Sequence, residues 1–388
     1  MNIVITTETY LPFIAGVSSS SDNIARFMAR SGHTTTLIAP NPTKDGHVND
    51  EKNLTIVRTP SFPDPFFAGK SFSPIPLPLW KIFSIIRKGS CDIVHIQEPG
   101  ALGVPALLRA KALKIPVIGA LHFTPEQIFR ILSFPENSRS KQIILLFMKF
   151  FYNACDGIMI PTQTFSTMLK NIGVTKPIVV VSNGVDTNEF TPTKNRIEKR
   201  EAYGLPNDKI LFFFLGRLDF DKHADTIIKT LPYTNDTIHL VIAGVGKEEN
   251  NFRALAKKIG VQDRITWLGH LDQTQMKDVY QSVDTFVLMS PYEVQSIVTL
   301  QAISAALPIL ACKEGALPEL CHDGINGFTI ATDDHTALAE KMNILSLDEN
   351  LRNTFGQESR KISLPHDRNV ALSHLEQFYK KIIASRKK

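Results

Sequence analysis

The stretch SPYEVQSIVTLQAISAALP, residues 290–308, combines a polar turn with a helical run that stops just before its final proline. It places an acid, Glu293, in the turn and an amide, Gln301, within the helix. We expect the helix to begin near Gln295 or Ser296, so that its unpaired backbone N–H groups and the positive end of its dipole face the same space as Glu293. This combination predicts a binding site for a polyhydroxylated anion.

A second polar group follows a strand further upstream. The apolar run at residues 210–215 breaks at Gly216 and Arg217, and Lys222 follows five residues after the arginine. Two cations are therefore presented at the carboxyl end of a strand, which is where open α/β sheets bind ligands. The alternative is that Arg217 and Lys222 are surface cations paired with the two aspartates that lie between them in the sequence.

Short apolar runs alternate with amphipathic helical stretches along the chain, and the pattern resets after Asn183 and Gly184. Such runs are typical of buried parallel strands covered by helices on both faces. We therefore predict an α/β fold with two doubly wound, Rossmann-like parallel-sheet domains. The expected strands are residues 3–6, 34–38, 92–96, 116–121, 157–160 and 178–181 in the first half, and 211–215, 239–243, 265–268, 285–288, 308–311 and 327–330 in the second.

Composition is consistent with a globular protein of two domains. The chain has 388 residues, and this length exceeds the size at which a single hydrophobic core keeps growing. Its residues are 43% hydrophobic and 21% charged, an ordinary balance for a globular protein. The four cysteines are scattered without metal-ligand spacing, which indicates reduced thiols in a cytoplasmic protein. We see no targeting segment, no membrane span and no feature that predicts a nucleic-acid partner.

The net charge of +5 is unevenly distributed. Residues 1–187 hold 18 Lys and Arg against 12 Asp and Glu, or +6, whereas the rest hold 25 against 26, or −1. This excess indicates either contact with an anionic surface or no more than a contribution to solubility.

These segments, in this order, resemble the carboxy-terminal half of the retaining GT-B glycosyltransferases of family 4, also called group 1. In that family a Gly-Arg pair and a Lys six residues after the Gly hold the diphosphate of the donor, and two acids separated by seven residues hold its sugar and ribose. The matching residues are Gly216, Arg217, Lys222 and Glu293, with Gln301 in place of the second acid. The resemblance also covers residues 1–16, 181–190 and 324–327, and so extends over nearly the whole chain.

The resemblance implies two domains that face a cleft. Residues 1–187 would bind the acceptor, residues 188–365 would bind the nucleotide sugar, and residues 366–388 would form a helix that crosses back to the first domain. Residues 187–208 read as the linker between the two domains.

The resemblance also implies further site residues. Gly16 would let the backbone approach a phosphate, although it could be a simple turn residue, and the serines after it could be a helix N-cap. His122 would lie against the donor sugar, with a structural histidine as the alternative. Ser296 would bind the donor at the helix start. Glu319 would bind it too, or be a solvated helix residue. His95 and Glu98 are weaker candidates.

The implied activity is retaining transfer of a hexose, without a metal or other cofactor, from a nucleotide-diphosphate sugar that we expect to be a UDP-sugar such as UDP-glucose. The acceptor is a hydroxyl compound, either soluble or a lipid such as diacylglycerol. Residues 292–296 resemble the diacylglycerol glucosyltransferase branch. The segment 139–152 and the loop at Phe66 and Phe67 suit a protein bound peripherally to the anionic inner face of the cell membrane, unless these aromatics are core.

Two rivals remain open. Gln301 would suit a non-catalytic binding or regulatory subunit that keeps the fold, and a sugar-nucleotide epimerase shares the two-domain architecture.

Overall fold

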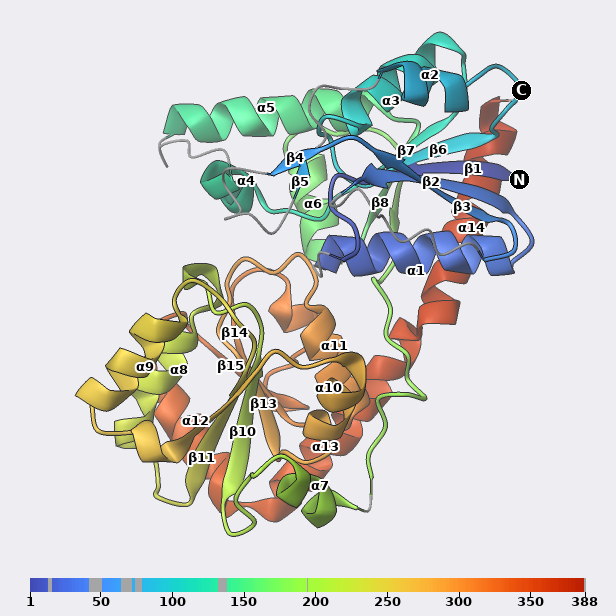
Figure 1. Ribbon diagram of the computed structural model, residues 1–388. Helices are drawn as coiled ribbons and strands as arrows, with labels where there is room; N and C mark the ends of the chain where they lie inside the picture. Colours follow the sequence, from blue (N-terminus) through green and yellow to red (C-terminus); the bar gives the residue numbers. More distant parts are fainter. Residues whose placement is uncertain are drawn as a thin grey trace. The chain divides into compact units, whose positions relative to one another are not determined.

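The computed structural model describes residues 1–12, 16–41, 51–63, 72–73, 79–131, 138–193 and 195–386. The chain forms two compact units. Unit 1 comprises Met1–Asn183 together with Asn369–Lys388, and unit 2 comprises Gly184–Arg368 (Figure 1). The segment expected to link two domains, residues 187–208, lies within unit 2.

Unit 1 is built on a seven-stranded sheet in the order β3-β2-β1-β6-β7-β8-β9. All neighbours in it are parallel. Its strands are β1 (Asn2–Thr6), β2 (Thr34–Pro40), β3 (Leu54–Thr59), β6 (Ile93–Ile96), β7 (Val117–Ala120), β8 (Gly157–Ile160) and β9 (Ile178–Val180), and a separate antiparallel pair is formed by β4 (Phe62–Pro63) and β5 (Phe72–Ser73). Its helices are α1 (Gly16–Arg30), α2 (Leu79–Ile85), α3 (Gly103–Ala112), α4 (Pro125–Ile131), α5 (Ser138–Ala154), α6 (Gln163–Asn171) and α14 (Arg368–Arg386).

The C-terminal helix α14 is part of the core of unit 1 (Figure 1). Leu372, Leu375 and Tyr379 are buried in one cluster with Ile3 of β1 and Ile118 of β7. Burial of apolar side chains from both ends of the chain stabilises the unit by joining them in a single core.

Unit 2 is built on a six-stranded parallel sheet in the order β12-β11-β10-β13-β14-β15. Its strands are β10 (Ile210–Leu215), β11 (Ile238–Ala243), β12 (Ile265–Gly269), β13 (Thr285–Leu288), β14 (Ile309–Cys312) and β15 (Gly327–Ile330). Its helices are α7 (Arg196–Ala202), α8 (Ala224–Thr230), α9 (Glu249–Lys258), α10 (Gln273–Tyr280), α11 (Ile297–Ser304), α12 (His335–Leu347) and α13 (Glu349–Ser363). The predicted fold class, two doubly wound parallel sheets, is confirmed.

Two local features differ from the sequence expectations. Helix α1 begins at Gly16, so the serines after it lie inside the helix, where the Ser21 hydroxyl donates to the backbone oxygen of Val17. The N-cap interpretation of these serines is therefore wrong. Strand β3 was not predicted, because Thr55 and Arg58 interrupt its apolar pattern.

Residues 187–208 contain helix α7, which two ion pairs to Asp284 hold against the sheet of unit 2. The guanidinium groups of Arg196 and Arg200 both reach the Asp284 carboxylate, at 2.5 and 2.7 Å. The same carboxylate accepts a hydrogen bond from the backbone N–H of Leu211 in β10. This part of the chain is therefore a structural element of unit 2.

Candidate active site

The cations predicted in unit 2 lie at the carboxyl end of β10, in the turn that follows it. Lys222, with 15% of its side chain exposed, places Nζ 2.6 Å from Oε1 of Glu293. Arg217 is 46% exposed and pairs with Asp219 at 2.8 Å and with Asp221 at 3.5 Å. The structure thus brings Lys222 and Glu293 together, and it places Arg217 among the neighbouring aspartates.

Gly216 precedes these cations and is not required there by packing. A Cβ built on it would meet its nearest neighbour, Cζ of Phe214, at 3.4 Å, which is an ordinary van der Waals contact. A side chain could therefore be accommodated here by packing, and the glycine is consistent with close approach of a ligand to the backbone.

The loop that carries Glu293 follows β13 and is held by the turn at Gly315. The backbone N–H of Ala316 donates to the backbone oxygen of Glu293 at 3.2 Å. Gly315 has φ +68°, and a Cβ there would lie 2.6 Å from the backbone oxygen of Pro291. A side chain at this position would displace the loop, so the glycine helps to fix Glu293 beside Lys222. Glu319, half-buried in the short helix η4 (Leu317–Glu319), follows the same turn.

Ser296 is the N-cap of helix α11, as the sequence indicated. Its hydroxyl oxygen accepts hydrogen bonds from the backbone N–H of Thr299 at 3.2 Å and from the Thr299 hydroxyl at 2.8 Å. Capping in this way starts the helix directly after the loop that holds Glu293. The positive end of the helix dipole therefore lies a few residues after Glu293, the partner of Lys222, and favours an anion at this edge of the sheet.

Gln301 lies one turn further along α11 and contacts a buried tyrosine. The Tyr280 hydroxyl donates to the backbone oxygen of Val298 at 2.8 Å and to Oε1 of Gln301 at 3.2 Å. The side-chain oxygen of Gln301 therefore already has a protein partner, which leaves its NH₂ group as the part that can donate to a ligand.

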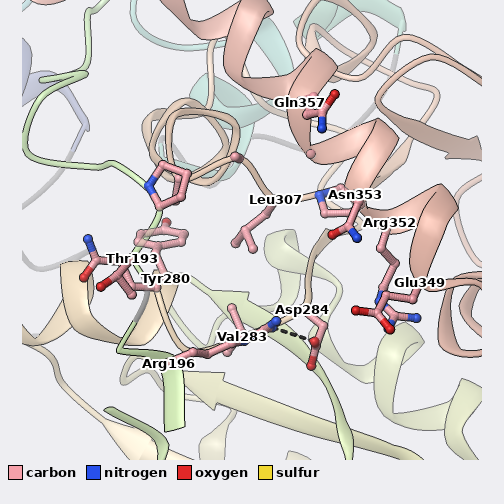
Figure 2. Close-up of a pocket in the computed structure, with 16 residues that line it drawn as sticks. Thr193, Arg196, Tyr280, Val283, Asp284, Leu307, Glu349, Arg352, Asn353 and Gln357 are labelled. Carbon is pink, nitrogen blue, oxygen red and sulfur yellow. Dashed lines mark hydrogen bonds and ion pairs between the residues drawn. The ribbon is translucent and has the colours of Figure 1, made fainter. Parts of the chain in front are cut away.

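The ring of Tyr280 also lines a cavity of about 410 Å³ at the other edge of the sheet (Figure 2). Val283 and Asp284, just before β13, and Leu307, just before β14, line it as well, so it opens at the amino ends of the strands. Figure 2 shows Arg196 reaching Asp284 there, which is the ion pair that anchors α7. This cavity is distinct from the carboxyl-edge site, because it lies at the opposite ends of the strands. Open α/β sheets bind their ligands at the carboxyl ends.

The predicted residues of unit 1 also lie at the carboxyl edge of its sheet. Gly16 is the exposed first residue of α1. His122, two residues beyond β7, is partly buried, and its Nε2 lies 2.7 Å from Oε1 of Gln97. Burial lowers the pKa of His122 to about 4, so its ring is neutral at physiological pH.

Behind His122 lies a set of buried titratable groups. His95 is fully buried, and burial lowers its pKa to about 3, with a further contribution from His122. Burial raises the pKa of Glu98 to about 8 and that of Glu8 to about 7, and the charge of Glu8 adds to the shift of Glu98. The sequence analysis treated His95 and Glu98 as weak candidates and did not identify Glu8. Both acids nevertheless lie two residues after the end of a strand, since β1 ends at Thr6 and β6 ends at Ile96.

Glu8 and Glu98 are held by backbone and side-chain donors. Oε1 of Glu8 accepts from the backbone N–H groups of Leu102 and Gly103, at 2.8 and 3.1 Å, at the start of α3. Oε2 of Glu98 accepts from the Thr7 hydroxyl and from the backbone N–H of Glu8 itself. Among the residues that the structure describes, the buried Oε1 of Glu98 has no hydrogen-bond partner. Burial therefore favours the protonated form of both carboxyls in the folded protein.

Two family models match this chain. One, described as glycosyl transferases group 1, matches residues 195–362, and the other, described as Glycosyltransferase Family 4, matches residues 14–189. Together they account for most of the sequence. The chain belongs to these glycosyltransferases.

Individual relatives agree with this membership. The glycosyltransferase is 25% identical to the alpha-monoglucosyldiacylglycerol synthase of Streptococcus pneumoniae over 84% of this chain and 74% of the relative. It is 27% identical to the GDP-mannose-dependent alpha-mannosyltransferase of Corynebacterium glutamicum over 86% of this chain and 78% of the relative. The solved structure of Anabaena Alr3699/HepE in complex with UDP-glucose matches it with a TM-score of 0.77 and 18% identity, covering 99% of this chain and 100% of that one, which shows a shared fold.

The glycosyltransferase therefore uses a sugar nucleotide as its donor, and neither the non-catalytic subunit nor the epimerase is favoured. Its GT-B fold and its membership of the family are the parts of the sequence prediction that the comparisons confirm. In the parts of the chain that the structure describes, no helix is both long and apolar enough to span a membrane.

Proposed function

We propose that this glycosyltransferase transfers a hexose, with retention of anomeric configuration, from a UDP-sugar to a hydroxyl group of a membrane lipid such as diacylglycerol. The observation that carries the proposal is the Lys222–Glu293 ion pair, set beside the start of α11 at the carboxyl edge of the unit 2 sheet. It offers a cation to the diphosphate and a carboxylate to sugar hydroxyls in one place.

Departure of the nucleoside diphosphate creates negative charge that fixed cations can stabilise. Lys222 would act as a point charge on the diphosphate, and Arg217 would act as a planar fork that exchanges its aspartate partners for phosphate oxygens. Because Lys222 already touches Glu293, its ammonium group can bridge the diphosphate and the residue that binds the sugar. No metal ion is needed for this role, and we assign none.

Retention follows from the family resemblance, which implies attack from the face that the diphosphate leaves. The bond between the anomeric carbon and the diphosphate oxygen breaks as the acceptor oxygen bonds to the same carbon. The acceptor proton passes to the departing phosphate oxygen, so the atoms balance without a nucleophile from the protein. His122, neutral at physiological pH, would hydrogen-bond to the donor sugar and carry no charge to it.

Gln301 and Gly16 would complete the donor site. The NH₂ group of Gln301 would donate to a ribose oxygen where the family acid accepts from the ribose hydroxyls, since Oε1 of Gln301 faces Tyr280. Gly16, at the start of α1, would allow close approach of a phosphate to the backbone N–H groups of the helix. Ser296 would act through its capping of α11, and Glu319 through its place after the Gly315 turn.

A lipid acceptor is supported by an exposed apolar stripe on helix α5. Ile143, Leu146, Phe147 and Phe150 are 63%, 52%, 45% and 66% exposed, at the i, i+3, i+4 and i+7 spacing that marks one face of a helix. Exposed aromatic and aliphatic side chains in such a row suit an interfacial helix. Phe147 and Phe150 are therefore not core, whereas Phe151 and Tyr152 of the same segment are buried. The Streptococcus pneumoniae relative is named for a glucosyldiacylglycerol product, which favours the same acceptor class.

Two basic residues begin the same helix. Arg139 and Lys141 are exposed, and Lys141 lies 3.5 Å from Glu126 of α4. Lys149, the third cation expected to face lipid, is half-buried, and its ammonium group lies against Gly173. We therefore propose that Arg139 and Lys141 supply the anionic-lipid contact and that Lys149 does not. The loop at Phe66 and Phe67 lies outside the described residues.

The test of the proposed function is product identification. The purified protein is incubated with UDP-glucose, other UDP-hexoses and GDP-mannose, each with diacylglycerol in vesicles or with a soluble polyol, and products are identified by mass. We expect a glycosylated diacylglycerol from a UDP-hexose. Transfer only to the soluble polyol, or only from GDP-mannose, would contradict the proposed acceptor or donor respectively.

The membrane part has its own test, in co-sedimentation with anionic and neutral vesicles. We expect Phe150→Ser, and separately Arg139→Gln with Lys141→Gln, to weaken binding to anionic vesicles, the double change by roughly 1 kcal/mol per charge at low salt. Leu347→Ser removes an equally exposed apolar residue from unit 2 and should leave binding unchanged. Equal binding of the wild type to both kinds of vesicle, or to neither, would remove the anionic-membrane contact.

A further inference from the structure

Four polar side chains of unit 1 form a continuous line from helix α14 to His122. The Tyr379 hydroxyl lies 2.5 Å from Nδ1 of His95. The amide nitrogen of Gln97 lies 3.2 and 3.3 Å from the two ring nitrogens of His95, and its amide oxygen lies 2.7 Å from Nε2 of His122. Tyr379, His95 and Gln97 are completely buried, and only His122 at the end of the line reaches solvent.

The line has a direction. An amide oxygen can only accept a hydrogen bond, so Nε2 of His122 must carry a proton to make the 2.7 Å contact with Gln97. A neutral imidazole carries one proton, and His122 is neutral at physiological pH because burial lowers its pKa. Nδ1 of His122 is therefore bare and can accept a hydrogen bond.

These buried polar groups are not what packing alone would select. Strands β6 and β7 are otherwise apolar here, and a polar side chain in a core destabilises the fold unless it is fully hydrogen-bonded. Apolar residues at positions 95, 97 and 379 would pack there without that requirement. The line ends at the one ring that is accessible to a ligand, which indicates that its role concerns this ring.

We propose that Gln97 is a positioning residue that holds His122 in the Nε2–H tautomer, so that Nδ1 accepts a hydrogen bond from a hydroxyl group of the donor sugar. Tyr379 holds the His95 ring, against which the amide nitrogen of Gln97 lies. The proton on Nε2 is assigned from the Gln97 contact, the bare Nδ1 follows from the neutrality of the ring, and the sugar contact rests on the proposed function. The same arrangement makes the C-terminal helix α14 part of the support of the site.

The tautomer is measured by long-range proton–nitrogen NMR spectra of the histidine rings of the full-length protein without substrate. The His122 signals are assigned by their loss in His122→Asn. We expect protonated Nε2 and bare Nδ1 in the wild type. Gln97→Glu keeps an acceptor oxygen and should keep the proton on Nε2, whereas Gln97→Met removes the acceptor and should give a mixture of tautomers.

Tyr379→Phe removes the hydroxyl partner of His95 Nδ1, loosens the ring against which the Gln97 amide lies, and should also give a mixture. Tyr152→Phe is the matched control, since its buried hydroxyl donates only to the backbone oxygen of Ala120, and it should leave the His122 pattern unchanged. A wild-type ring protonated on Nδ1, or an unchanged pattern in Gln97→Met, would overturn the proposal.

Activity separates this proposal from the proposed function. With a donor that the wild type uses, we expect Gln97→Met to lower turnover by about tenfold, the effect of one lost hydrogen bond, and Gln97→Glu to restore most of it. Equal turnover in both variants would overturn the sugar contact. If the wild type turns over no sugar nucleotide, the proposed function fails, while the tautomer result stands by itself.

Discussion

The carboxyl edges of the two sheets carry opposite kinds of polar group. In unit 2 the residues are charged and reach solvent: Arg217 pairs with aspartates and Lys222 pairs with Glu293. In unit 1 they are buried or, for His122, partly buried, and burial lowers the pKa of His122 and raises that of Glu98, which keeps both neutral over much of the physiological range. One edge is thus suited to a charged diphosphate, and the other to hydrogen bonds with uncharged hydroxyl groups.

This contrast predicts that the largest losses of activity come from the charged edge. Arg217→Ala or Lys222→Ala should lower turnover by on the order of 100-fold or more, because each removes charge stabilisation that matters most in the transition state. Steady-state kinetics with the accepted donor measures the loss. A chelator should leave the wild type active. Undiminished turnover in either variant would contradict the assignment of these cations to the leaving group.

The buried edge predicts an unusual dependence of stability on pH. The folded pKa of Glu98, about 8, lies above its ordinary value, so its contribution to stability is full below pH 4.5 and is lost as pH rises towards 8. The histidines act in the opposite sense, since their lowered pKa values reduce stability only as pH falls below about 6.5. Between pH 6.5 and 8 the carboxyl effect therefore dominates this edge.

Glu98→Gln should reduce the fall in folding stability between pH 6.5 and 8. The wild-type free energy of unfolding should fall by up to about 1.4 kcal/mol per pH unit for this one group, and denaturant melts at pH 6.5 and 8 measure it. Glu126→Gln, which changes a half-exposed carboxyl of the same unit, is the control and should keep the wild-type slope. An unaltered slope in Glu98→Gln would show that this carboxyl is ionised in the folded protein.

The smallest effect is expected at Gln301, where the charged edge departs from the family. Gln301→Glu should keep or raise donor affinity within about tenfold, since one oxygen can still accept from Tyr280 while the other makes a charge-assisted bond to ribose. Turnover should change less than binding. Calorimetric titration with the donor measures the affinity, and complete loss of binding would mean that Gln301 does not hold the ribose.

The two edges also differ in how far the sequence reveals them. The charged edge could be predicted, because Gly216, Arg217 and Lys222 lie within one turn and Glu293 directly precedes a helix start. The Lys222–Glu293 contact itself needed the structure, since 70 residues separate the two in the chain. Its alternative, pairing of the cations with nearby aspartates, holds for Arg217, and Lys222 also lies 3.9 Å from Asp221 in addition to its contact with Glu293.

Most of the contacts at the buried edge of unit 1 could not be predicted from the sequence. His122 was found because it follows a strand, but its support comes from Gln97 and Tyr379, which no spacing connects to it. The start of α1 was misplaced because serines favour caps and turns over helix interiors. Strand β3 was missed because an edge strand with exposed polar residues lacks a continuous apolar run.

The central claim is that the charged edge of unit 2 stabilises the departing diphosphate, and the most direct test compares binding with turnover in Lys222→Ala. The affinity of this variant for the donor is measured by calorimetry and its turnover by product formation at saturating donor. We predict that turnover falls on the order of 100-fold while affinity falls less than tenfold, because the ammonium group contributes most as charge develops. A variant that loses affinity but keeps its turnover would contradict the account.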